Sequence, residues 1–96
     1  MYVHVVLFRW QDTAAPEDID HVMAELLDLK GKVPGLVEST GGANESTRSQ
    51  GYSHGAVMKF QDRAALEAYA THPAHQRVLQ LLAAVMAQVV VLDYLI

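Results

Sequence analysis

The sequence predicts a single α+β domain whose elements follow the order β-α-β-β-α-β. Four segments are rich in apolar and β-branched residues, as strands are, and they cover residues 2–10, 35–40, 52–60 and 86–96. Two longer segments repeat apolar residues at helical spacing, and they cover residues 16–30 and 61–85. Because the chain has 96 residues, we expect one small domain that spans residues 1–96.

The first strand, YVHVVLFRW at residues 2–10, is apolar on both of its faces. Alternate residues of a strand point to opposite sides of a sheet. The two sets are Val3, Val5 and Leu7 on one side, and Val6, Phe8 and Trp10 on the other. A strand that is apolar on both sides is expected to be covered on both sides.

The first helix is expected to begin at Pro16, because proline fits the first helical position, where no backbone N–H is needed. Glu17 and Asp18 then suit the positive end of the helix dipole. The apolar stripe of this helix consists of Ile19, Val22, Met23, Leu26 and Leu29. Gly31 is expected to end the helix, and Pro34 prevents its continuation.

Glycine and proline also separate the remaining elements. A short strand, GLVEST at 35–40, is followed by a polar connection at 41–51 and by the strand YSHGAVMKF at 52–60. The second helix covers 61–85, and Pro73 forces a break or a restart within it. The strongly apolar MAQVVVLDYLI forms the fourth strand.

A chain of this order folds as a four-stranded antiparallel sheet with both helices on one face, the ferredoxin-like arrangement. Right-handed connections give the strand order 4-1-3-2. The helices leave the other face, with Val3, Val5 and Leu7, uncovered. We therefore expect a homodimer that forms through the sheet face opposite the helices.

The composition argues against several classes of function. The net charge is −4 and the basic residues are scattered, so we expect no nucleic-acid partner. No apolar run approaches the roughly 20 residues that span a bilayer, and no secretion signal is evident, so we expect a cytoplasmic protein without a membrane role. The sequence has no cysteine, which excludes thiolate catalysis and disulfides.

A histidine and an aspartate are expected to pair across the sheet. If Val5 and Leu7 face the dimer partner, His4 points toward the helices of its own chain. Strands one and four are antiparallel neighbours in the predicted order, so His4 near the start of one lies close to Asp93 near the end of the other. An aspartate in this position would fix the tautomer of the imidazole and raise its basicity.

The stretch AYATHPAHQRV at residues 68–78 places one phenol and two imidazoles around Pro73. Proline disfavours helical backbone at the preceding residue, so His72 is expected to mark the break, and either its imidazole or the Thr71 hydroxyl is expected to cap the next helical segment. His75 lies in the first turn of that segment, where the helix N-terminus lowers the pKa of an imidazole. Tyr69 and His75 are then either an oxyanion donor with a general base, or a hydrogen-bonded pair that closes one end of the core.

Five motifs occur in order along the chain: HVVLFRW, VPGLVEST, GYSHGAVMKF, YATHPAH and VVVLDY. Together they resemble the stress-responsive A/B barrel domain family (Dabb), within the dimeric α/β-barrel superfamily. The resemblance covers nearly the entire chain. It implies a βαββαβ fold and a dimer closed into a β-barrel.

The resemblance also implies roles for individual residues. A plant cyclase of this family closes a linear polyketide by intramolecular aldol condensation, and its tyrosine–histidine pair corresponds to Tyr69 and His75 here. Two strand histidines of that cyclase correspond to His4 and His54. A tyrosine that lines its pocket is replaced by Leu26, so the shape of the pocket is expected to differ.

We therefore predict a homodimer that binds a small, partly apolar carbonyl compound and catalyses a cofactor-free cyclisation or related aldol or lyase step, with Tyr69 and His75 as the catalytic pair. The residues expected to contact the ligand are His4, His54, His72, Asp93, Leu26 and Met58. No metal is expected, because His-x-x-His interrupted by proline is not a usual ligand pair. Two alternatives stay open: a non-catalytic stress-responsive or accessory dimer, and a heme-binding or oxygen-using relative within the superfamily.

Overall fold

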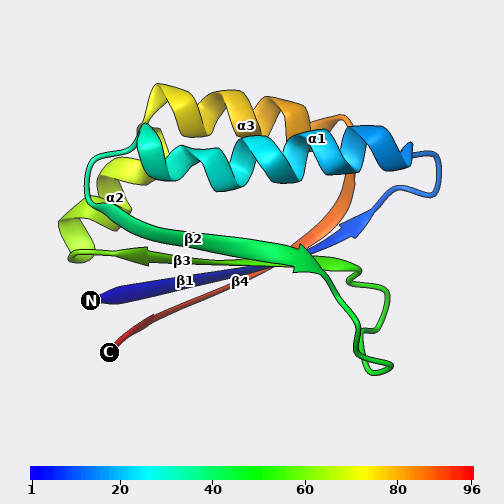
Figure 1. The fold of residues 1–96 in the computed structure, drawn as a ribbon, viewed down its shortest axis with the longest axis horizontal. Coiled ribbons are helices and arrows are strands. Elements are labelled where there is room, and N and C mark those ends of the chain that lie inside the picture. The colour runs from blue at the N-terminus through cyan, green and yellow to red at the C-terminus, as the bar shows by residue number, and fades with distance from the viewer.

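The computed structural model covers residues 1–96 and confirms the predicted order of strands and helices (Figure 1). Its strands are β1 (Tyr2–Trp10), β2 (Leu36–Ala43), β3 (His54–Phe60) and β4 (Met86–Leu95). Its helices are α1 (Pro16–Leu27), the short 3-10 helix η1 (Asp28–Gly31), α2 (Arg63–Thr71) and α3 (Pro73–Ala83). None of these helices combines the length and the apolar character needed to cross a membrane.

The four strands form one antiparallel sheet in the order β2-β3-β1-β4, which is the predicted order read from the opposite edge. The helices lie together on one face of this sheet (Figure 1). In the register, Val6 of β1 lies between Ala56 of β3 and Val91 of β4. The sheet therefore places β1 in its interior and leaves β4 as an edge strand.

The connection between β2 and β3 is shorter than the sequence predicted. β2 extends beyond the predicted end at residue 40 to Ala43, and β3 begins at His54 instead of residue 52. A Cβ atom on Gly41 would lie 2.6 Å from the carbonyl oxygen of Gly55, so Gly41 permits a close approach of two strands and does not form a turn. Gly41 therefore lies within β2 and does not mark the end of this strand, as the sequence had suggested.

The core lies between the sheet and the helices. It centres on Phe8, Met58 and Phe60, none of which is more than 1 % exposed. The predicted stripe of α1 reaches this core through Val22, Met23 and Leu26, and Leu29 of η1 continues it. This packing holds α1 against the sheet and sets the back wall of the site described below.

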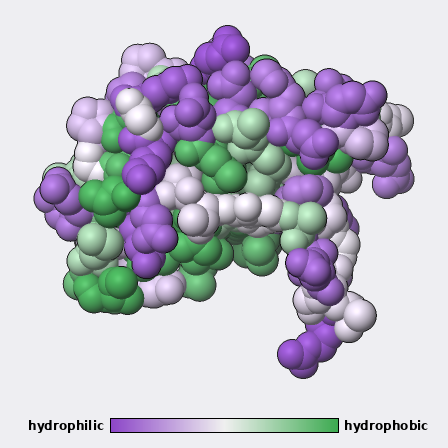
Figure 2. Space-filling view, viewed as in Figure 1, coloured by the Kyte–Doolittle hydropathy of each residue, from purple (hydrophilic) through white to green (hydrophobic).

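The sheet face opposite the helices is apolar and largely uncovered in the single chain. On β4, Val90, Leu92 and Tyr94 point to this face and are between 43 % and 56 % exposed. Leu7 of β1 adds to the same surface, whereas Val3 is already buried between the neighbouring strands. Figure 2 shows hydrophobic residues gathered on the sheet side of the molecule, away from the helices.

Candidate functional site

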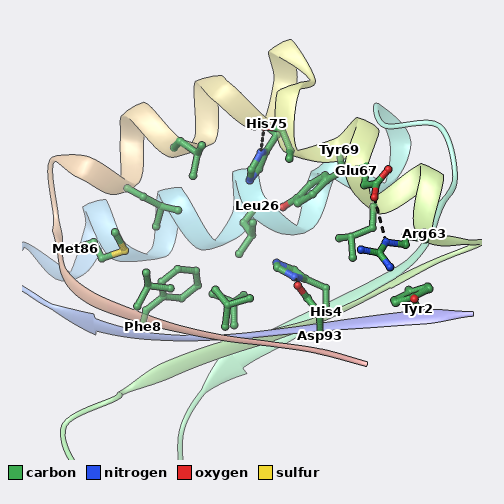
Figure 3. A pocket seen from close by; sticks show the side chains of 17 residues that line it. Tyr2, His4, Phe8, Leu26, Arg63, Glu67, Tyr69, His75, Met86 and Asp93 are labelled. Atoms are coloured by element: carbon green, nitrogen blue, oxygen red, sulfur yellow. Dashed lines mark hydrogen bonds and ion pairs between the residues drawn. The ribbon is translucent and has the colours of Figure 1, made fainter. Parts of the chain in front are cut away.

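A cavity of about 590 Å³ lies between the sheet and the helices. Its floor is the helix-facing side of β1 and β4, its roof is formed by α2 and α3, and Leu26 of α1 lines its back (Figure 3). Hydrophobic residues make up 12 of the 17 that line it, and the other five are His4, Arg63, Glu67, His75 and Asp93. A mostly apolar hollow of this size with a few polar groups is typical of a small-molecule site.

The cavity exists because the helices do not fully cover the edge strand. Val89 and Val91 of β4 point to the helix side, since they pair with Phe8 and Val6 of β1. Phe8 and Val6 are buried, whereas Val89 and Val91 are 40 % and 51 % exposed. The hollow is therefore accessible to solvent along β4.

The predicted pairing of His4 with Asp93 is confirmed. The two residues are direct cross-strand partners of β1 and β4, and His4 Nδ1 lies 2.5 Å from Asp93 Oδ1. Because a carboxylate only accepts hydrogen bonds, Nδ1 is the nitrogen that donates to it. The Nε2 atom of neutral His4 is then left with a free lone pair at the floor of the cavity.

The break between α2 and α3 brings Tyr69 and His75 together. Residues six apart on a continuous helix lie roughly 120° apart around its axis, since each residue turns the helix by about 100°. With Pro73 interrupting the helix, the ring centroids of Tyr69 and His75 instead lie 4.0 Å apart, and the rings are tilted by 33°. The His72 imidazole accepts a hydrogen bond from the Ala74 backbone N–H at 3.0 Å, so of the two predicted caps it is the imidazole, and not the Thr71 hydroxyl, that forms.

The same break determines which nitrogen of His75 is protonated. In a continuous helix the Ala70 carbonyl would accept from the Ala74 N–H, which is instead bound by His72. The Ala70 carbonyl accepts from Gln76 Nε2 at 2.8 Å, and His75 Nδ1 lies 3.2 Å from it. Because a carbonyl cannot donate, Nδ1 carries the proton, and Nε2 of neutral His75 is free to act as a base.

Burial is the main cause that lowers the pKa of His75, and the nearby imidazoles His4 and His72 lower it further when they are charged. The hydrogen bond to the Ala70 carbonyl acts in the opposite direction. The predicted direction of the shift is confirmed, although desolvation and not the helix N-terminus is the leading cause. His75 is therefore a neutral base at neutral pH.

Tyr69 is 3 % exposed, and its ring also lies near His4, with 5.9 Å between ring centroids. Its hydroxyl donates to the Met58 sulfur at 3.5 Å, and sulfur is a weak acceptor. Burial raises the pKa of the Tyr69 phenol, so the hydroxyl keeps its proton at neutral pH. The Tyr69 hydroxyl could therefore exchange its weak hydrogen bond to the Met58 sulfur for a stronger one to an oxygen atom of a ligand.

Three residues predicted to contact a ligand, His54, His72 and Met58, do not line this cavity. His54 pairs with Phe8 and not with His4 in the register, and it accepts a hydrogen bond from Trp10 Nε1 at 2.8 Å. The His72 imidazole caps α3 by accepting the hydrogen bond from the Ala74 N–H, and it does not line the cavity. Met58 is fully buried beneath Tyr69. The structure places the other predicted residues, Tyr69, His75, His4, Asp93 and Leu26, around the cavity as expected.

The charged end of the cavity was not predicted from the sequence. Tyr2, Arg63 and Glu67 line it at the end nearest the start of β1 and α2 (Figure 3). Tyr2 lies two residues before His4 and therefore points to the same helix-facing side of β1. The alternation of side chains along a strand could have identified Tyr2 as a residue of the cavity. Arg63 and Glu67 have only the four-residue spacing of an ordinary surface pair, so the sequence held no comparable signal for them.

A family model described as the stress responsive A/B barrel domain matches residues 3–96. The chain belongs to this family. The resemblance predicted from the five sequence motifs is confirmed, and with it the ferredoxin-like fold.

Three relatives show the range of similarity. The Arabidopsis thaliana stress-response A/B barrel domain-containing protein HS1 is 27 % identical over 93 residues, which cover 95 % of this chain and 85 % of HS1. A dimeric ferredoxin-like protein of unknown function from Jannaschia sp. CCS1 is 34 % identical with a TM-score of 0.86, over 99 % of this chain and 98 % of that chain. Hydroxynitrile lyase from Passiflora edulis is 21 % identical with a TM-score of 0.90, over 99 % and 92 % of the two chains, a likeness of fold.

The lowered pKa of His75 predicts a specific pH dependence of stability. Between the folded-state pKa and the usual value of about 6.5, the unfolded chain binds more protons at this residue than the folded protein does. The free energy of unfolding is therefore not reduced by protonation of His75 above a pH of about 6.5. It decreases as the pH falls from there toward the folded-state pKa. We expect the free energy of unfolding of His75→Asn, measured with urea at fixed protein concentration, to depend less on pH in this range. An unchanged pH dependence in the variant would contradict the assignment.

Proposed function

We propose that this protein binds a small, partly apolar carbonyl compound in the cavity and catalyses a cofactor-free enolisation, which leads to an aldol-type cyclisation or cleavage. The observation that supports this most strongly is the pairing of a neutral imidazole with a protonated phenol inside a mainly apolar hollow. Proton abstraction next to a carbonyl needs a base near neutral pH and a donor for the developing oxyanion. His75 and Tyr69 meet these two needs without a metal or a cofactor.

In the proposed reaction, His75 Nε2 removes a proton from the carbon next to the carbonyl of the ligand. The electron pair of that C–H bond moves into the enolate, and the Tyr69 hydroxyl hydrogen-bonds the enolate oxygen in place of the Met58 sulfur. In an aldol step the enolate carbon then bonds to a second carbonyl carbon, whose oxygen takes the proton from the His75 imidazolium. Protons and electrons balance within the ligand and this one imidazole.

His4 is proposed as a positioning residue for this chemistry. Asp93 fixes its ring, and its Nε2 atom faces the cavity close to Tyr69. A neutral His4 can accept a hydrogen bond from a hydroxyl or enol of the ligand, and so orient the carbon that loses its proton toward His75. The apolar wall of Leu26, Leu82 and Val89 would hold the hydrocarbon part of the same ligand.

The enolisation step can be tested alone with 2-octanone in D₂O, by following deuterium exchange next to its carbonyl by NMR. We expect His75→Ala to slow the exchange by about 10²- to 10⁴-fold, because a positioned general base contributes on this scale. Tyr69→Phe should also slow it, through loss of the oxyanion donor. His21→Ala is the matched control, because His21 is an exposed imidazole of α1 outside the cavity.

Exchange that continues at the wild-type rate in a folded His75→Ala protein would contradict the catalytic assignment. Circular dichroism confirms folding of each variant, and Tyr69→Phe gives an independent test if His75→Ala fails to fold. Absence of exchange in the wild-type protein would instead favour the second candidate, a non-catalytic accessory dimer.

We also propose that two copies assemble through the sheet face opposite the helices and close a β-barrel. The exposed side chains of Val90, Leu92 and Tyr94 support this face, because burying exposed apolar area stabilises an assembly by about 25 cal/mol per Å². The dimeric relative from Jannaschia supports the assembly. The uncovered apolar face is also the observation that favours the second candidate function, a non-catalytic accessory dimer.

The interface face can be tested with two neighbouring residues of one strand. Val90→Asp places a charge on the proposed interface, and Val89→Asp places the same charge on the cavity side of β4. In sedimentation velocity at micromolar concentration, we expect Val90→Asp to be a monomer and Val89→Asp to remain a dimer. A monomeric wild-type protein, or a dimeric Val90→Asp variant, would contradict this interface.

A further inference from the structure

We propose that Arg63 and Tyr2 form a head-group site for the carboxylate of an amphipathic ligand, at the charged end of the cavity. This inference rests on the proposed function, because it assumes that the cavity binds a ligand. It adds a substrate class: an oxo acid whose carboxylate lies at Arg63, whose carbonyl lies between Tyr69 and His75, and whose apolar part lies deeper in the hollow.

The polar and apolar residues of the cavity are arranged along its length. Figure 3 shows Arg63, Glu67 and Tyr2 at one end, and Phe8 and Met86 at the other, with the histidines between them. A ligand with one charged end and one apolar end would therefore bind in a single direction. This direction would place the middle of the ligand at Tyr69 and His75.

The hydrogen bonds of Arg63 leave its anion-binding groups available. Its Nε atom donates to Glu67 Oε1 at 3.1 Å, and neither Nη group donates to another atom of the chain. The two terminal nitrogens of a guanidinium can bind a carboxylate through two parallel hydrogen bonds. Glu67 thus holds the guanidinium at the cavity while the edge that binds anions stays free.

Helix stability does not account for an arginine at this position. Arg63 is the first residue of α2, where the positive end of the helix dipole makes a cation unfavourable. Its pair with Glu67 has the cation N-terminal to the anion, which is the weaker order for this spacing. Both side chains are about 70 % exposed, at 74 % and 68 %, so the pair contributes little to folding.

Tyr2 supplies a second donor beside Arg63. It is the first residue of β1, its side chain lines the same end of the cavity, and its hydroxyl makes no hydrogen bond within the chain. Tyr2 and His4 are two residues apart on one face of the strand, a separation of about 7 Å. A carboxylate at Tyr2 would therefore leave the carbonyl of the ligand several bonds away, beside His4 and Tyr69.

The test compares octanoate with octanamide, which share a chain and differ in charge. Binding of each is measured by NMR titration and by calorimetry at low salt. We expect the wild-type protein to bind octanoate roughly three- to tenfold more tightly, since the contact is a charge-assisted pair at a partly exposed site. Arg63→Gln should abolish this preference and leave the affinity for octanamide unchanged. Tyr2→Phe should reduce the preference without abolishing it.

Two controls separate this site from other effects. Arg77→Gln removes the same charge from α3 at a residue outside the cavity, and it should keep the preference for octanoate. Glu67→Gln breaks the ion pair as Arg63→Gln does, but it should keep or increase the preference, because the guanidinium remains and the negative charge beside the ligand carboxylate is removed. Equal losses in the Arg63 and Glu67 variants would mean that only the ion pair matters, and would overturn the proposal.

The outcomes also distinguish this inference from the proposed function. If the wild-type protein binds both compounds equally, or Arg63→Gln keeps the preference, the head-group site is wrong while the cavity remains a ligand site. If neither compound binds in the cavity, both proposals fail.

Discussion

Helix α2 ends and α3 begins at His72, because Pro73 lacks the backbone N–H that a continuous helix requires. This interruption places Tyr69 at the end of one helix and His75 at the start of the next, with their rings 4.0 Å apart. It also releases the Ala70 carbonyl, which lies 3.2 Å from His75 Nδ1 and leaves Nε2 free. The geometry of the proposed base and its oxyanion donor therefore depends on one break in the backbone.

Strand β4 connects the cavity with the proposed dimer interface. Its alternate residues Val89, Val91 and Asp93 face the helices, and Val90, Leu92 and Tyr94 face the opposite side. The inner set gives the cavity an apolar wall and holds His4 through Asp93. The outer set gives the sheet an apolar surface that one copy of the chain cannot cover. An edge strand with this composition therefore contributes to both the cavity and the proposed interface.

The order of the elements, joined by right-handed connections, was enough to predict the sheet order, and alternation along two antiparallel neighbours then predicted the pairing of His4 with Asp93. Alternation gives the face of a residue but not its position in the sheet, so His54 was expected to contact the ligand although it lies on β3 beside Trp10, and β3 does not line the cavity. Met58 shares the correct face but lies too deep, beneath Tyr69. Arg63 was missed because only the docking of α2 on the sheet brings it to the cavity, and this docking is a property of the tertiary structure.

The proposed reaction requires a hollow that admits a carbonyl compound to Tyr69 and His75. A crystal structure of the protein soaked with a linear β-triketone tests this most directly. We expect a carbonyl oxygen of the ligand within about 3 Å of the Tyr69 hydroxyl, and an adjacent carbon facing His75 Nε2. A cavity closed by its own side chains, or a ligand bound only elsewhere on the protein, would contradict the proposed function.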